Sequence, residues 1–206
     1  MTKSLLSDIN IDTLTELFNI GIGQAASSLS DMINEHVVLT VPSVYCLEIQ
    51  DAPEKAPLPE APILSAVKQR FEGAFSGSAL LIFPEKDSLE LVRRILATDV
   101  SLEELSELEE DALLEVGNII LNACFYTISN LLDCKIAGDM PIHNRGNSEQ
   151  LFSSVGIENC TIVLQLSMGF SIPNHAVNGT ISFLMSMSEL HKFIGLLDRY
   201  VEKLMS

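Results

Sequence analysis

The same spaced pattern of residues occurs twice in this chain, and this duplication constrains the fold more than any other feature. Asp-x3-Glu-x2-Asn, followed after 22 intervening residues by Pro, starts at residue 12 and again at residue 111. Every member of the second copy lies 99 positions after its counterpart. The paired members are Asp12 and Asp111, Glu16 and Glu115, Asn19 and Asn118, and Pro42 and Pro141. Two copies in one chain predict an internally duplicated protein with two similar sites.

A direct alignment of the two halves supports the duplication. Residues 7–42 and 106–141 share eight identities in 36 positions, whereas about two are expected by chance at this length. We therefore expect a single domain over residues 1–206, built from half-repeats at approximately 7–100 and 106–206.

Hydrophobic periodicity predicts the same order of elements in both halves. In the first half we expect a helix over 7–35, a strand over 37–50 with Pro42 at an edge or bulge, a loop over 51–62, strands over 63–74 and 77–84, and a helix over 86–98. In the second we expect a helix over 106–133 opened by the capping box Ser106-x-x-Glu109, a short strand over 135–142, a polar loop over 143–150, strands over 160–171 and 177–186, and a helix over 188–204. The predicted fold class is α/β (α+β). It has pseudo-twofold symmetry, two long motif helices and a shared, mostly antiparallel sheet packed with helices.

The composition of the chain disfavours some classes of binding partner and indicates a cellular location. The chain is 47% hydrophobic, enough for a core, and has a formal net charge of −16. Such a charge disfavours nucleic acid and anionic lipid, which need clustered Lys and Arg. No apolar run approaches the roughly 18 residues of a membrane span, and the first residues lack the apolar stretch of a signal peptide. We expect a cytoplasmic protein without membrane insertion.

Cysteine and histidine usage argues against a metal centre. The four cysteines, at positions 46, 124, 134 and 160, are far apart and form no C-x-x-C motif, and the four histidines are equally scattered. In a cytosolic chain these cysteines are expected to be reduced and mostly buried. We therefore expect no metal site and no cofactor held by this chain.

The repeated Glu and Asn define one face of each motif helix, because residues three apart on a helix lie about one turn from each other. The polar stripe of the first helix contains Asp12, Glu16, Asn19, Gly23, Ser27 and Ser30, and that of the second contains Asp111, Glu115, Asn118, Asn122, Tyr126 and Ser129. The first stripe is small and flat around Gly21, Gly23 and Ser27, which favours close approach by another protein. A plain solvated helix face is the simpler interpretation, but it does not require one Glu, one Asn and one distant Pro at the same spacing twice.

An Asn amide carries donors and an acceptor, so it can hold a water molecule at a fixed angle. For a reactive phosphoryl group, orienting that water is most of what a protein must supply. The neighbouring Glu is a poor base against an anionic phosphoryl group and a better anchor for a cation on a partner.

Other chemistries fit less well. A glycosidase needs two carboxyl groups facing each other across a cleft, and a phosphate-binding Gly-Lys-Ser/Thr loop is absent. Gly21-x-Gly23-x-x-Ala26 resembles a dinucleotide fingerprint but lies inside a predicted helix without a preceding strand. No sequence pattern indicates a nucleophilic Ser or Cys.

With its Pro spacing, the doubled motif resembles the CheC family of bacterial chemotaxis phosphatases, which includes CheC, CheX and FliY. The resemblance covers essentially the whole chain and rests also on Asn19-Ile-Gly-x-Gly-x-Ala-Ala and Glu115-Val-Gly-Asn118-Ile. Two motifs in one chain are typical of the CheC type, whereas CheX carries one and dimerises. FliY adds a flagellar-switch domain, which we do not expect here.

The resemblance implies a role for each motif residue. Asn19 and Asn118 would orient the water that attacks the phospho-aspartate of the response regulator CheY, and Glu16 and Glu115 would pair with a regulator lysine. Asp12 and Asp111 would support the helix start, and Pro42 and Pro141 would shape the following strand. The Mg²⁺ would belong to the regulator, and the deamidase CheD is implied as a further partner. An alternative is a non-catalytic module that sequesters CheY-P or CheD. A structural relative with no phosphatase partner is a third.

One departure distinguishes the two copies. The family usually has Gly immediately before the motif Asn; the second copy has Gly117, but the first has Phe18. The ring of Phe18 either turns inward and packs or obstructs docking beside Asn19. On this basis Glu115 and Asn118 form the more secure of the two predicted sites.

Overall fold

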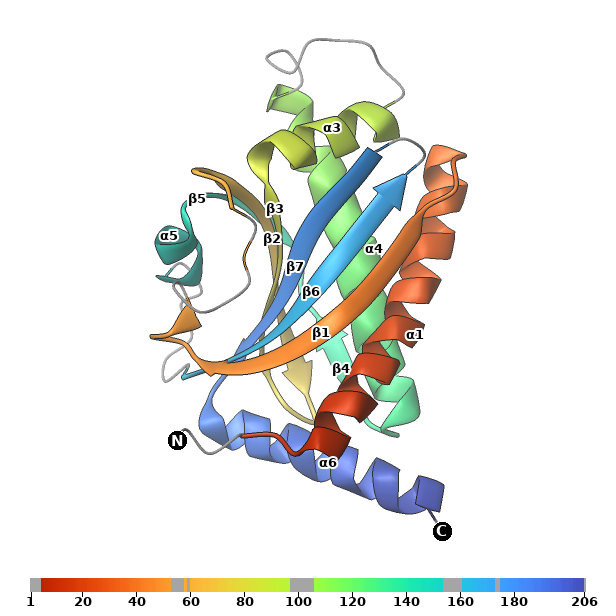
Figure 1. Ribbon diagram of the computed structural model, residues 1–206, viewed down its shortest axis with the longest axis vertical. Helices are drawn as coiled ribbons and strands as arrows, with labels where there is room; N and C mark the ends of the chain where they lie inside the picture. The colour runs from red at the N-terminus through yellow and green to blue at the C-terminus, as the bar shows by residue number, and fades with distance from the viewer. Residues whose placement is uncertain are drawn as a thin grey trace.

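A computed structural model describes residues 5–52, 58, 60–96, 106–153, 161–172 and 175–205, with the backbone alone at 42, 106–109, 172, 175, 176 and 178. Two long helices lie along one face of a twisted antiparallel sheet, and shorter helices close its ends (Figure 1). The predicted mixed fold with a shared antiparallel sheet is confirmed.

Outside residues 143–153, the elements follow one another in the predicted order. The first half contains α1 (Asp8–Ile33), β1 (Val38–Glu48), β2 (Leu64–Gly73), β3 (Gly77–Pro84) and α3 (Glu85–Ile95). The second contains α4 (Ser106–Leu131), β4 (Ile136–Gly138), β5 (Ile142–Gly146), α5 (Ser148–Ser153), β6 (Ile162–Ile172), β7 (His175–Met185) and α6 (Met187–Met205). Both motif helices have 26 residues. The capping box predicted at the start of α4 lies on side chains outside the described set.

The sheet joins the two halves by exchanging strands. Its order is β1-β6-β7-β3-β2-β4, with β5 also paired to β2, and every pairing in the described part of the chain is antiparallel. The central pair β3 and β7 contributes one strand from each half. At the two edges, β1 pairs with β6 of the second half, while β4 and β5 pair with β2 of the first. Neither half therefore completes its own part of the sheet.

The strand registers repeat at the same shift as the sequence motif. Leu39 pairs with Phe170, and Gly138, 99 positions after Leu39, pairs with Phe71, 99 positions before Phe170. Each edge also contains an irregularity at its Pro. The β1–β6 register shifts between Thr40 and Ser43, and in the second half residues 139–141 separate β4 from β5. The predicted bulge at Pro42 is confirmed, as expected for a residue that has no N–H for the ladder.

Local hydrogen bonds between helix and strand are duplicated as well. Ser30 Oγ accepts from the Val37 backbone N–H at 2.9 Å, and Ser129 Oγ accepts from that of Ile136 at 3.1 Å. Asn34 and its counterpart Asp133 both adopt the left-handed conformation, with φ values of 53° and 48°. These residues end the motif helices and turn the chain into the following strand.

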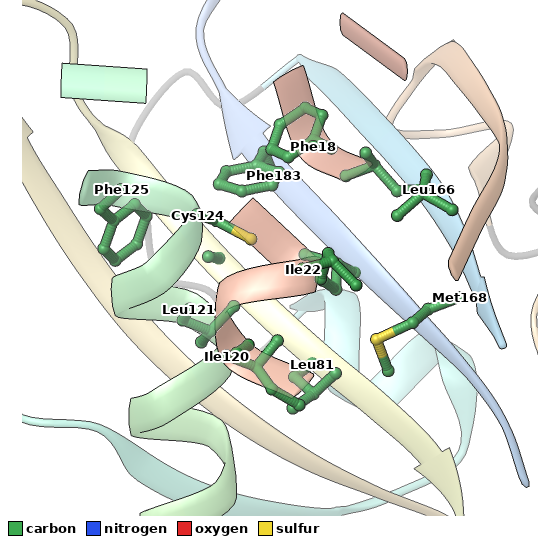
Figure 2. Close-up of a cluster of buried hydrophobic side chains, with 14 of the residues drawn as sticks. Phe18, Ile22, Leu81, Ile120, Leu121, Cys124, Phe125, Leu166, Met168 and Phe183 are labelled. Atoms are coloured by element: carbon green, nitrogen blue, oxygen red, sulfur yellow. The ribbon is translucent and has the colours of Figure 1, made fainter. Parts of the chain in front are cut away.

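The main core lies between the two motif helices and the sheet. Figure 2 shows side chains from α1, α4 and several strands meeting in this layer, including Ile22, Ile120 and Leu81. Where α1 approaches α4, a Cβ on Gly21 would lie 3.0 Å from Thr127 Oγ1. Gly21 is therefore buried in the helix–helix contact, and the prediction that it belongs to the open face is wrong. A smaller core on the opposite face lies under α5 (Figure 1).

Two other sequence predictions need correction. The stretch 143–150, predicted as a polar loop, instead holds most of β5 and the start of α5. Asn147 and Gln150 exchange side chain–backbone hydrogen bonds of 2.9 Å, a reciprocal cap that starts this helix. In addition, Glu110–Leu131 of α4 is long and apolar enough to span a membrane by length and composition, but more than half of its most apolar stretch is buried inside the protein. Its apolar residues contact α1 and the sheet, as in a core helix.

Candidate functional site

Both motif helices turn their polar stripe to solvent, as predicted. Glu16 and Glu115 are exposed, and within the described part of the chain neither carboxylate forms an ion pair or accepts a hydrogen bond. Asn19 is exposed and Asn118 is half-buried. Each helix therefore offers an unpaired carboxylate and, one turn further, an amide.

The Asn19 amide is held by the strand that follows its helix. Its Oδ1 accepts a hydrogen bond of 3.0 Å from the Val41 backbone N–H, and its Nδ2 lies 3.5 Å from the Val41 carbonyl oxygen. Because a backbone N–H can only donate, this contact determines which end of the amide is oxygen. One lone pair of Oδ1 and one N–H of Nδ2 stay free.

The bulge in β1 explains why 22 residues separate the motif Asn from the motif Pro. Val41 and Pro42 lie in the register shift, so the polar groups of Val41 turn from the ladder toward α1. Pro42 has no N–H to lose there, and it restricts the residue before it to extended conformations. The spacing between Asn19 and Pro42 thus places Val41 directly against the Asn amide.

The second site holds its Asn by a different route. Asn118 Oδ1 accepts from Asn122 Nδ2 at 2.7 Å, and Asn122 Oδ1 accepts from Gln69 Nε2 at 3.3 Å. Gln69 Nε2 also donates to the Asp139 carbonyl oxygen at 2.8 Å. Asn118 is therefore linked indirectly to the segment before Pro141, whereas Asn19 contacts the segment before Pro42 directly. Among the described residues, Nδ2 of Asn118 has no hydrogen-bond partner.

Phe18 and Gly117, which precede the two motif Asn residues, both face the core. Phe18 is 1% exposed, and its ring centroid lies 5.3 Å from that of Phe183 (Figure 2). Of the two predicted outcomes for Phe18, the structure shows the inward one, so its ring does not obstruct docking. Gly117 is buried against Val67, where a Cβ would lie 2.4 Å from Cγ1. The contrast between these two residues concerns packing against the sheet and does not decide which site is accessible.

The remaining motif residues lie at the margins of the two sites. Asp12 and Asp111 are exposed on their helices, beyond the first turn. The residue that caps α1 is Ser7, whose side chain accepts from the Asn10 backbone N–H at 3.2 Å. Asp12 was expected to support the start of α1, but Ser7 makes the capping hydrogen bond there. Pro141 is half-buried just before β5.

Two residues of the second site were not recognised as functional from the sequence. Asn122 lies in the predicted polar stripe and Gln69 in the strand predicted over 63–74, and the sequence patterns predict no role for either residue. Gln69 is 1% exposed and alternates with Val67 and Phe71 on the face of β2 that lies toward the helices. A Gln at an otherwise apolar, period-two position was the available signal, since a buried amide needs partners.

A hollow of about 830 Å³ lies beside the second site, with Asn122, Tyr126 and Ser129 of α4 among its lining residues. In the part of the chain that the structure describes, no three His, Cys, Asp or Glu side chains gather as metal ligands. Burial raises the pKa of the Cys124 thiol to about 12 and that of Cys46 to about 11, so neither is a ready nucleophile.

Comparisons with known proteins support the resemblance drawn from the motif. The model of the CheC-like family matches residues 9–46, which include the first Asp-x3-Glu-x2-Asn and its Pro. The chain is 25% identical over 139 residues to the CheY-P phosphatase CheC of Bacillus subtilis, and 26% identical over 133 residues to the flagellar motor switch phosphatase FliY of the same organism. These matches cover 66% and 64% of this chain, 66% of CheC and 34% of FliY.

The fold is similar to that of Thermotoga maritima FliY, with a TM-score of 0.79 at 19% identity. The match covers 95% of this chain and 99% of that structure. The resemblance to the CheC family is thus confirmed by sequence, and the fold agrees with it.

Proposed function

We propose that this chain is a phosphatase that removes the phosphoryl group from the phospho-aspartate of the response regulator CheY. The observation that carries the proposal is the pair of exposed helix faces, each with an unpaired Glu and an amide held by hydrogen bonds. The relative from Bacillus subtilis named CheY-P phosphatase CheC supports the choice of substrate.

The proposed chemistry needs no nucleophile or metal from this chain. An aspartyl phosphate is already reactive, and the regulator would supply the divalent cation that neutralises its phosphoryl oxygens. Asn19 or Asn118 would enter the regulator's active site and hold a water in line with the phosphorus atom. Glu16 or Glu115 would pair with a lysine of the regulator and fix the approach. Holding the amide in advance lowers the entropic cost of the attack.

Charge reversal at the two docking carboxylates tests the proposal. Phosphate release from phosphorylated CheY is measured with the wild type and with Glu16→Lys/Glu115→Lys. The variant should raise KM for the regulator about tenfold or more and change kcat little, because the lost contact acts in docking. Glu149→Lys, at an exposed position of α5, makes the same change in charge per site away from both helices and should behave as wild type.

The result separates the candidate functions. Wild type that binds phosphorylated CheY without releasing phosphate would replace the phosphatase with a sequestering module. Wild type that neither binds nor releases phosphate would refute both.

CheD and a cytoplasmic location are further parts of the proposal. Both rest on the likeness to chemotaxis proteins, and CheD rests on the family resemblance alone. Titration calorimetry of purified chain with CheD would test that partnership, and an absence of heat at micromolar concentrations would remove CheD from the account. Fractionation of cells that express the chain would test the location.

A further inference from the structure

Gln69 is a buried polar side chain in an apolar layer, and its partners point toward the second site. It lies between Val67 and Phe71 on the helix-facing side of β2. Its Oε1 is buried and has no hydrogen-bond partner in the described structure. Burying an oxygen without a hydrogen-bond partner costs free energy, and an apolar residue would fill this position without that cost. The amide is therefore best explained by what its Nε2 does.

The direction of every hydrogen bond in this network follows from the Asp139 carbonyl. A carbonyl oxygen only accepts, so the atom of Gln69 that lies 2.8 Å from it is Nε2. The same Nε2 then faces Oδ1 of Asn122, which leaves Nδ2 of Asn122 to donate to Oδ1 of Asn118. As a result Asn118 holds its oxygen toward Asn122 and keeps both N–H groups of Nδ2 for other partners.

The other half of the molecule differs at three positions on which this relay depends. At the shift of 99 that relates the strand registers, Gln69 corresponds to buried Met168. Asn122 corresponds to Gly23, which has no side chain to donate.

The third difference supplies space. Gly138, where a Cβ would lie 2.6 Å from Gln69 Nε2, corresponds to buried Leu39. The three differences are consistent with one another. Gln69 occurs in the half where Gly138 leaves space for its amide, whereas Met168 and Leu39 occupy the equivalent positions of the other half.

We propose that Gln69 is a positioning residue for Asn118, acts through Asn122, and serves the second site alone. This inference rests on the proposed phosphatase function. The first site instead orients Asn19 through the Val41 backbone, so the two sites hold their Asn amides by independent means.

The test replaces Gln69 with its counterpart in two backgrounds. In Asn19→Ala, where only the second site can act, Gln69→Met should lower kcat about three- to tenfold, the range of one lost neutral hydrogen bond, and leave KM for phosphorylated CheY unchanged. In Asn118→Ala, where only the first site can act, the same substitution should change nothing. Equal loss in both backgrounds, or no loss in either, would overturn the proposal.

Two further measurements separate positioning from folding. Gln69→Met removes a buried oxygen that has no partner, so the variant should unfold at the same urea concentration as the wild type or a higher one. Asn122→Asp keeps the shape of the exposed side chain but removes its donor, and it should reproduce the kinetic effect in the Asn19→Ala background.

Side-chain NMR keeps the test valid if the phosphatase proposal itself fails. In the ¹⁵N-labelled chain without CheY, Gln69→Met should lower the order parameter of the Asn118 side-chain amide and leave that of Asn19 unaltered. An unchanged Asn118 amide would overturn the relay whatever the enzymatic result. A wild type without activity but with this NMR change would refute the proposed function alone.

Discussion

The packing of Gly117 gives the sharpest test of how the motif helices are seated on the sheet. A Cβ at this position would lie 2.4, 2.6 and 2.9 Å from three carbon atoms of Val67. Since contacts below 3.0 Å are essentially never seen for a Cβ, Gly117→Ala forces α4 and β2 apart by about 1 Å. Overpacking of this kind costs about 1–3 kcal/mol, and the helix propensity of Ala returns about 1 kcal/mol. We expect a net loss of about 1 kcal/mol, and at most about 2 kcal/mol, in the free energy of unfolding.

Gly23→Ala is a matched control for this substitution. Gly23 also lies inside a motif helix, but a Cβ there has nothing within 4 Å. The free energy of unfolding of this variant should be about 0.5–1 kcal/mol higher than that of the wild type, because Ala has the higher helix propensity. Val67→Ala should lower the free energy of unfolding less in the Gly117→Ala background than in the wild type, because it relieves the clash with the added methyl group. The expected coupling energy between the two substitutions is about 1 kcal/mol.

Urea unfolding followed by far-ultraviolet circular dichroism measures the stability of the wild type and of the four variants. At a slope of about 2–3 kcal/mol per molar, the midpoint of Gly117→Ala should fall by roughly 0.5 M and that of Gly23→Ala should rise. The displacement should also reduce phosphate release by the second site, since an error of about 1 Å in placing a catalytic group can cost about 10² in rate. A Gly117→Ala protein as stable as Gly23→Ala would refute the packing of α4 against β2.

Two other predictions concern ionisable groups. Burial opposes the charged form of Glu189, but hydrogen bonds from Lys192 and Ser76 outweigh it and lower the pKa of this carboxyl below its ordinary value of 4.5. The contribution of Glu189 to stability is therefore present at neutral pH and lost as pH falls below about 4.5, so Glu189→Gln should cost about 1 kcal/mol at pH 7. That difference should disappear in unfolding measurements near pH 3, and a constant difference would contradict the pKa shift. In a Cys134→Ser/Cys160→Ser protein, a disulfide reagent at pH 8 should react with Cys46 and Cys124 only on unfolding, since about 10⁻³ or less of either thiol is ionised there. Fast labelling of the folded protein would contradict the burial of these side chains.

Most elements could be predicted because their apolar residues repeat at a single clear period. The prediction failed at 143–150, where β5 lies at the edge of the sheet and carries a polar sequence. An edge strand needs only one neighbour, so hydrophobic alternation is weak there. Asn147 and Gln150, which form the reciprocal cap of α5, are the local sequence signal for a helix start in this stretch.

The outward faces of the site could also be predicted, but not what holds the amides. Glu16 and Asn19 follow from helical spacing alone. The contact between Asn19 and Val41 depends on a bulge, and the relay from Gln69 depends on which strand lies beneath α4. Such contacts join residues far apart in the sequence through the strand exchange. Likewise, the ring of Phe18 does not obstruct docking, because this position of the helical turn faces the core. The difference in residue type between Phe18 and Gly117 does not by itself show this direction.

The central claim is that the two motif Asn residues orient the attacking water. The most direct test is phosphate release from phosphorylated CheY with wild type, Asn19→Ala, Asn118→Ala and the double variant. We expect each single variant to retain the activity of its intact site and the double variant to lose about 10² or more in rate, while circular dichroism shows all four folded. A folded double variant that releases phosphate as fast as the wild type would contradict the account.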